Sequence, residues 1–486
     1  MTQGRGFPKR RLVGVFLTLC LAAGLAAGEE VVPLEQHEKG ALEVPATEGA
    51  EDPLLADAVS PRLRRLGAAL SRDMTPRPWV LVPHTYEISG REYYLHILGY
   101  IKLDVMHDFE RLGRGVGFPH YFIPSEIPVQ DSYASSRDGR TGVTFNSSRF
   151  EFGLGTDTPI GRVSTLLDFN FLRKSTGRPS LNIRQFFLSL DQFRGGKSWT
   201  TFINLNSIPD TLDYQGPNSL PELRHPLVRW TQPLAIGPLT DSALFENLAL
   251  ALAVEWPEGD LYLPPGMRAR NPVPDLVASL QFQDGQSSVW LSGLYRRLKA
   301  AGNGVTTSTD AWGIQLAGNI PIKSVASVQF GAIYGVGLGH YLNDLQGLGL
   351  DAALDSAGKL RAIPAAAAWL AAQYWWRTDL RSTVSYGYVY LSDDFLEPLP
   401  GDFEGIYQQG HYASANLIWS PIPPMDIGLE YLFGYRENND GRDGLDNRLQ
   451  FSIILHFASG DSARGPEDIW DRLIGDDRPH ASSASP

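Results

Sequence analysis

Eight charged residues in the central part of the chain could together form a site for anions. They are Arg149, Arg162, Arg184, Arg224 and Arg229, with the acidic residues Asp210, Asp213 and Glu222. The planar guanidinium group of arginine can hold a carboxylate through two parallel hydrogen bonds. Each such charged contact contributes about 1.5–3 kcal/mol. Two of them would recognise a diacid.

The same arginines could instead serve structure alone, by pairing with Glu151, Asp168 or the three acids. Both interpretations stay open for each residue. Alternation of residue types places Arg149, Arg162 and Arg229 on the polar face of their segments. Arg184 is ambiguous, because its segment is apolar on both faces, as expected beneath a contact between subunits.

The segments that carry these arginines have the residue pattern of β-strands. Phe150, Phe152 and Leu154 alternate with polar or small residues such as Glu151. A period of two is typical of a strand with one apolar face. It recurs in about sixteen segments between Tyr93 and Phe457. They are residues 93–108, 143–156, 160–172, 182–191, 197–203, 224–232, 244–256, 274–284, 286–296, 309–319, 322–335, 365–376, 379–391, 411–420, 424–436 and 445–457.

Alternating strands occur both in water-soluble sandwiches and in membrane barrels, and the connections distinguish the two. Connections after even-numbered strands are mostly short, as at residues 157–159, 284–285, 377–378 and 421–424. Those after odd-numbered strands are mostly long, as at residues 109–142, 204–223, 257–273, 336–364 and 392–410. This asymmetry predicts an all-β fold, a sixteen-stranded antiparallel transmembrane β-barrel over residues 91–457 with short periplasmic turns and long extracellular loops.

The ends of the chain indicate export. Residues 1–28 combine four cations with an apolar run from Leu12 to Gly28 and read as a signal peptide. Residues 29–90 are predicted to be a periplasmic leader, partly disordered or with a short helix, and residues 458–486 a polar tail. The only cysteine, Cys20, would leave with the signal, so no disulfide supports the mature protein.

Composition excludes several classes of protein. With 43% hydrophobic, 11% aromatic and 20% charged residues, the chain is not intrinsically disordered. The formal charge of −12 becomes −16 once the four signal cations are removed, which argues against a nucleic-acid partner. The ten histidines show no paired zinc spacing, and no Gly-x-Ser-x-Gly elbow occurs. We therefore expect no enzymatic activity, no metal and no cofactor.

The most specific pattern lies between Asn182 and Pro233: NIRQFFLSLDQF, then GGKSWTTFINLNSIPDTLDYQGP, then RHPLVRWTQP. It resembles the DcaP-like porins, in which a strand, a glycine turn and a Trp-Ser strand lead into a Pro-x-Thr-Leu-Asp-x-x-Gly-Pro loop and an arginine-containing strand. GYIKLDVMHDF (Gly99–Phe109) resembles the first barrel strand of that family. The resemblance covers Tyr93 to Phe457. It implies a sixteen-stranded, trimeric outer-membrane channel for small anionic solutes such as dicarboxylic acids.

A barrel of this size needs a constriction to be selective. Loop 204–223 carries all three acids, and folded inward it would set them opposite the five arginines and produce a field across the lumen. The leading hypothesis is an outer-membrane porin, a passive channel for small anionic hydrophilic solutes such as dicarboxylic acids. Two alternatives are a hydrolase embedded in the barrel and a non-conducting barrel used for adhesion or envelope structure.

Overall fold

The computed structural model describes residues 85–88, 90–110, 112, 120–130, 139–172, 180–234, 247–284, 287–322, 325–397, 405–422 and 424–458. The predicted signal peptide, nearly all of the predicted leader and the tail after residue 458 lie outside these residues. None of the helices among the described residues is long and apolar enough to cross a membrane.

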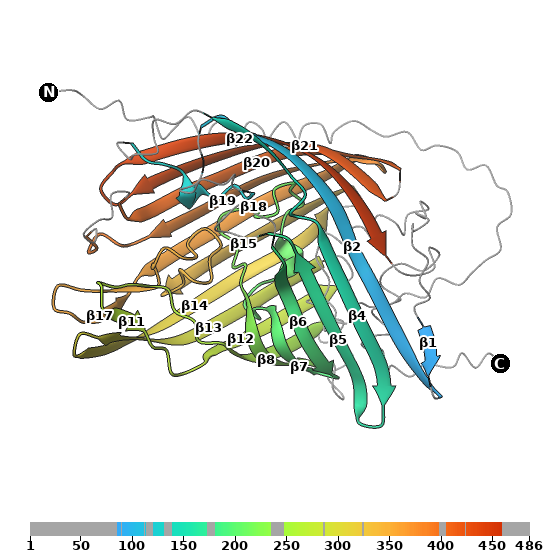
Figure 1. Cartoon of the computed structure of the whole chain (residues 1–486), viewed down its shortest axis with the longest axis horizontal. Coiled ribbons are helices and arrows are strands. Elements are labelled where there is room, and N and C mark those ends of the chain that lie inside the picture. Colours follow the sequence, from blue (N-terminus) through green and yellow to red (C-terminus); the bar gives the residue numbers. More distant parts are fainter. Residues whose placement is uncertain are drawn as a thin grey trace. The chain divides into compact units, whose positions relative to one another are not determined.

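Sixteen antiparallel strands form a closed ring (Figure 1). They are β2 (Arg91–Asp108), β4 (Arg149–Thr158), β5 (Gly161–Asn170), β6 (Asn182–Leu190), β7 (Phe193–Trp199), β8 (Arg224–Pro233), β9 (Leu248–Glu255), β12 (Asp275–Asp284), β13 (Ser287–Gly302), β14 (Val305–Ile322), β15 (Ala326–Val336), β18 (Pro364–Arg377), β19 (Leu380–Leu391), β20 (Tyr407–Ile422), β21 (Met425–Asn438) and β22 (Asp443–Ala458). The last strand closes the ring by pairing with the first, from Leu98 opposite Ala458 to Asp108 opposite Arg448.

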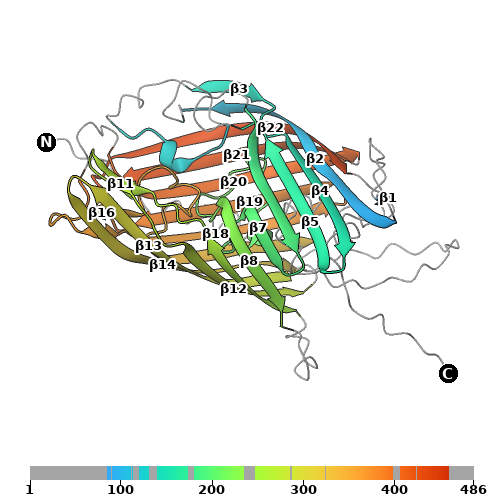
Figure 2. The ribbon, with the colours of Figure 1, turned by 60° about the horizontal axis from the view of Figure 1, so that its bottom comes forward.

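Of six further short strands in the described residues, three pair with this ring and three do not. β1 (Thr85–Ile88) and β3 (Arg140–Thr144) pair with β2, and β11 (Met267–Ala269) pairs with β13. β10 (Leu261–Tyr262), β16 (Ala352–Leu354) and β17 (Leu360–Ala362) form a separate small sheet in the long loops. Strands β4 to β9 lie on one side of the barrel and β18 to β22 on the other (Figure 2).

The alternation predicted from the sequence is an alternation between outside and inside. Leu252, Val254 and Ile314 point outward and are 43–48% exposed. Glu151 and Asp168, on inward positions of β4 and β5, are completely buried. Apolar outside and polar inside is the arrangement of a barrel that lies in lipid and encloses a polar interior.

Most predicted strands differ from the structure at one or both ends, and two of them differ in a way that affects the lumen. The segment 143–156 is divided into β3 and β4, because residues 146–147 form a turn. The segment 197–203 is wrong at both ends, since β7 begins at Phe193 and the chain leaves the wall after Trp199. The pair Gly195-Gly196 is therefore not a turn. At Gly196 (φ 135°) a Cβ atom would come within 2.5 Å of the Phe186 carbonyl oxygen, so glycine is needed inside the strand.

The connections follow the predicted asymmetry with three exceptions. At the long-loop rim, β13 and β14 are joined by Asn303 and Gly304 alone, and β21 and β22 by residues 439–442. At the other rim, β8 and β9 are joined by residues 234–247. Elsewhere the short rim carries tight turns such as residues 159–160, 191–192 and 378–379.

We predict that Leu252→Arg, in the middle of the outward face of β9, lowers the free energy of unfolding by about 2–4 kcal/mol, because the cation enters hydrocarbon. Urea titration in lipid vesicles measures this difference. Val305→Arg is the matched control. Val305 is also exposed, but it lies beside the Asn303-Gly304 hairpin, where the cost is about 0–1 kcal/mol. Equal losses for the two variants would contradict a lipid-facing position for Leu252.

Candidate functional site

The connection between β7 and β8, residues 200–223, folds into the barrel and is called the lumen loop below. Almost all of its residues are buried. Phe202, Ile203 and Leu205 pack in one apolar cluster with wall residues such as Ile333 and Trp369. The loop is therefore part of the core of the protein, not a surface connection.

Glu255, at the end of β9, fastens both ends of the lumen loop. At the loop's start, Thr200 Oγ1 and the Thr201 amide each donate a hydrogen bond of 2.7 Å to its carboxylate. At its end, His225 Nε2 lies 2.7 Å from Glu255 Oε2. The Tyr341 hydroxyl donates to the same carboxylate at 3.3 Å.

From this anchor the loop crosses to the opposite wall. The Trp369 indole of β18 donates to the Ser207 carbonyl at 3.0 Å. Farther along, the Asp213 amide donates to Glu430 Oε2 of β21 at 2.6 Å, and Gln450 Nε2 of β22 donates to the Leu212 carbonyl at 3.1 Å. The loop is thus backed against β18 to β22 and leaves β2 to β6 facing it.

Two further segments fold inward: residues 120–130 and the connection between β15 and β18. The residue pattern did not predict this. Asp344, in the connection between β15 and β18, accepts hydrogen bonds from the Ser125 amide (2.9 Å), Asn218 Nδ2 (3.2 Å) and the Tyr407 hydroxyl (2.7 Å). This one carboxylate therefore joins residues 120–130, the lumen loop and β20. Large apolar residues such as Phe122 and Leu342 are the signal in the sequence that could have predicted this, because such side chains are uncommon in loops exposed to water.

Arg149 and Arg184 meet at Asp168 on the wall that faces the lumen loop. Arg149 Nε and Nη2 each donate to the Asp168 carboxylate at 2.7 Å, and Nη2 lies 2.7 Å from Glu151 Oε1. Arg184 Nε lies 3.6 Å from Asp168 Oδ2. Pairing of β5 with β6 shifts between Asp168 and Phe169, leaving Arg184 opposite no residue. Such a bulge can redirect a side chain, which explains why its direction was ambiguous in the sequence.

Arg224 lies close to this group, where the chain re-enters the wall. Its guanidinium carbon is 3.7 Å from the centre of the Trp199 ring, a stacking distance. Burial raises the pKa of Tyr121 to about 12, and the positive charges of Arg184 and Arg224 oppose this shift while Glu222 adds to it. Arg184, Arg224, Tyr121 and Glu222 therefore lie within electrostatic reach of one another.

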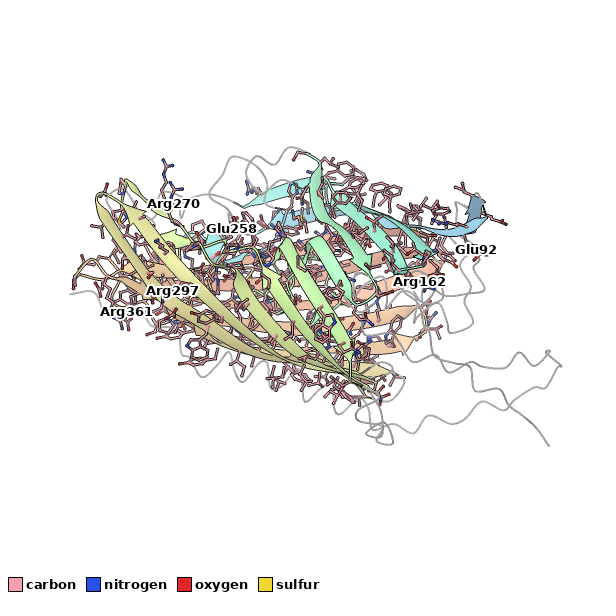
Figure 3. The ribbon with its side chains drawn as sticks, turned by 90° about the horizontal axis from the view of Figure 1, so that it is seen from below. Glu92, Arg162, Glu258, Arg270, Arg297 and Arg361 are labelled. Atoms are coloured by element: carbon pink, nitrogen blue, oxygen red, sulfur yellow. The ribbon has the colours of Figure 1, made fainter. Side chains whose placement is uncertain are left out.

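Arg162 and Arg229 face inward but lie away from this group. Arg162 pairs with Asp157 at 2.6 Å beside the β4–β5 turn, at the end of the barrel opposite Arg270 and Arg361 (Figure 3). Arg162 lies six positions before Asp168 on β5, about 20 Å along the strand. Arg229 is buried and lies opposite Arg194 in the pairing of β7 with β8, near the 191–192 turn.

The expected row of acids opposite the arginines is not formed. Asp210 pairs instead with Arg381 of β19 at 2.8 Å and accepts from Gln373 at 3.1 Å. Asp213 accepts from the Phe122 amide at 3.2 Å. Only Glu222 lies beside the arginine group. Strand alternation gives the face on which a side chain lies, but it does not say against which wall a loop packs, and the expectation was wrong for this reason.

Other inward arginines were missed. Arg296 pairs with Asp275 (2.9 Å) and Asp351 (3.0 Å), and Arg448 pairs with Asp108 at 2.6 Å. Their strands already placed them on the polar face in the sequence. Within the described part of the chain, no group of three or more His, Cys, Asp or Glu side chains could hold a metal ion.

The Asp213 carboxyl group makes the stability of the folded protein depend on pH. Burial raises its pKa to about 6 from an ordinary 3.8, so the folded protein binds this proton more tightly than the unfolded chain does. The resulting stabilisation is complete below pH 3.8 and is lost as the pH rises through about 6.

We therefore predict that Asp213→Asn, which keeps an acceptor for the Phe122 amide, raises the thermal unfolding midpoint at neutral pH and has little effect in acid. The gain is at most about 3 kcal/mol. Loss of the fast-migrating folded form on a detergent gel after heating measures the midpoint. Asp284→Asn, on an exposed strand end, is the control. A shift in the unfolding midpoint of Asp213→Asn from that of wild type would contradict the prediction if it were the same at neutral pH and in acid.

Comparisons with known proteins agree with this architecture. The chain shares 21% identity with the outer membrane channel DcaP of Acinetobacter baumannii, with a TM-score of 0.63 over 77% of this chain and 100% of that one. An anion-selective porin from Comamonas acidovorans is 12% identical, with a TM-score of 0.46 over 75% of this chain and 100% of that one. No curated protein compared with the chain matches it. The sequence profile of the DcaP outer membrane protein family matches residues 84–453. The chain therefore belongs to the DcaP outer membrane protein family of channels, located in the bacterial outer membrane.

Proposed function

We propose that the protein is a passive channel for small anionic hydrophilic solutes, dicarboxylic acids among them. The observation that carries this proposal is the pair Arg184 and Arg224 beside the lumen loop. Both are only partly buried, and both act on Tyr121. Arg149 differs from them, because Glu151 and Asp168 already occupy its guanidinium group.

A diacid could place one carboxylate at Arg184 and the other at Arg224. Each charged hydrogen bond contributes about 1.5–3 kcal/mol, and conduction requires that the total stays small enough for the solute to leave. Arg149 then acts as a positioning residue. It holds Asp168, and Asp168 in turn holds Arg184.

We predict that Arg184→Gln and Arg224→Gln each lower the ratio of anion to cation permeability several-fold, because each removes a partly buried positive charge from the edge of the lumen loop. The reversal potential of the protein in a planar bilayer under a potassium chloride gradient measures the ratio. Arg162→Gln is the matched control, since its charge lies beside Asp157 at the short-turn rim. A wild-type reversal potential that indicates cation preference would overturn the proposed solute class.

We also propose that the channel is a homotrimer whose subunits meet at β6 to β8. These strands have nine, seven and ten residues, whereas β13, β14, β20 and β22 have 16–18. A tilted seven-residue strand spans only about 18 Å, less than the ~25 Å apolar band of an outer-membrane barrel. Phe186, Phe193 and Val228 are 54–59% exposed on this face. A neighbouring subunit would cover it better than lipid of ordinary thickness.

Phe186→Arg is expected to convert the detergent-solubilised protein from trimer to monomer, as measured by light scattering corrected for bound detergent. Ile314→Arg, equally outward but on the long strand β14, should leave the trimer intact. A wild-type mass of one subunit would exclude this assembly.

A further inference from the structure

An apolar cluster lies inside the lumen, where polar side chains are expected in a water-filled barrel. Its members are Leu98 and Tyr100 of β2, Leu166 of β5, Phe187 of β6, Leu212 of the lumen loop, Ile418 of β20 and Ile454 of β22. All seven are at most 5% exposed. Tyr94 and Tyr214 pack against them and are partly buried.

This cluster lies directly beside the Arg149 group. In the strand pairing, Tyr100 is opposite Arg149 and Leu98 is opposite Glu151. Leu166 precedes Asp168 by two residues on β5, toward the short-turn rim. Two residues of a strand correspond to about 7 Å. A solute that leaves the arginine group toward the periplasm therefore meets the cluster next.

The lumen loop completes the cluster from the opposite side. The rings of Tyr214 and Tyr100 stand edge to face, with centroids 5.4 Å apart and an interplanar angle of 81°. Lys102 Nζ is 4.4 Å from the centre of the Tyr214 ring. β2 is hydrogen-bonded to β22, so the loop's packing continues from β22 onto β2. The cluster then extends it to Leu166 of β5 and Phe187 of β6.

Cations lie on the other side of the cluster as well. The Arg194 guanidinium carbon is 4.3 Å from the centre of the Phe187 ring, and Arg194 pairs in register with Arg229. Along this wall the order from the arginine group toward the short turns is therefore cationic, apolar, cationic. Both cationic layers attract anions, while the layer between them is mostly apolar, with the tyrosine hydroxyls as its polar groups, and replaces little of the water that an ion loses.

We propose that Leu212 and Tyr214 form an apolar gate with Leu98, Tyr100, Leu166 and Phe187, which holds back small hydrated anions and favours organic anions with an apolar body. An inorganic ion loses hydration in such a layer without compensation, and apolar constrictions stop ions in this way. An aryl or alkyl carboxylate instead brings its own apolar surface against these side chains. Tyr214, partly buried, moves to admit it. This inference rests on the proposed anion channel.

The test compares full-length wild type with Leu212→Asn and Tyr214→Ser in planar bilayers. Single-channel conductance is measured in potassium chloride, and the permeability of benzoate relative to chloride is measured from reversal potentials with one salt on each side. We expect both variants to raise chloride conductance several-fold and to lower the benzoate-to-chloride ratio. Tyr214→Trp should do the opposite. Tyr431→Ser, on the lipid-facing side of β21, is the control and should match wild type.

Folding of each variant is checked by its heat-dependent mobility on a detergent gel. Should Leu212→Asn fail to fold, the partly buried Tyr214 decides the question through its two variants. Unchanged chloride conductance and an unchanged benzoate-to-chloride ratio would overturn the gate while leaving the anion channel in place. Cation preference of the wild type in potassium chloride alone would overturn the proposed function itself, so the two failures are distinguishable.

Discussion

The backbone of a membrane-embedded chain has no water with which to form hydrogen bonds, and this constraint determines the rest of the structure. A sheet satisfies every peptide group only if it has no free edge. Here the pairing of β2 with β22 removes the last edge. Closure fixes which face of each strand meets lipid and which meets the lumen. For this reason apolar residues lie on the outside of the barrel, and polar and charged residues lie inside it.

Buried charges in the lumen have two different environments. Arg149, Arg296 and Arg448 each face one or two carboxylates at 2.6–3.0 Å. Removing one partner of such a buried pair destabilises the fold by much more than the intact pair stabilises it, because a buried charge is left without a partner. These arginines therefore hold strands and loops in place. Arg184 and Arg224 are only partly buried. They are the two charges that we propose meet a solute.

The lumen loop links these features. One of its faces packs in an apolar cluster with wall residues such as Ile333 of β15 and Trp369 of β18. Glu255 accepts hydrogen bonds at both ends of the loop, and Glu430 and Gln450 hold its middle. A loop fixed at so many points is a well-anchored part of the barrel interior. The proposed solute class and the proposed gate therefore both depend on the same packing.

Sequence alone determined the number of the strands and their approximate positions, most of the asymmetry of the rims and the family, because a two-residue period and short turns are local properties that neighbouring residues encode. It also placed Arg149 and Arg229 correctly on inward faces. Tertiary structure alone decided that Asp210 pairs with Arg381, that a bulge brings Arg184 to Asp168, and that Leu212 reaches the wall near Arg149. These contacts join residues far apart in the chain across a closed ring, and no local pattern records which wall a loop will meet.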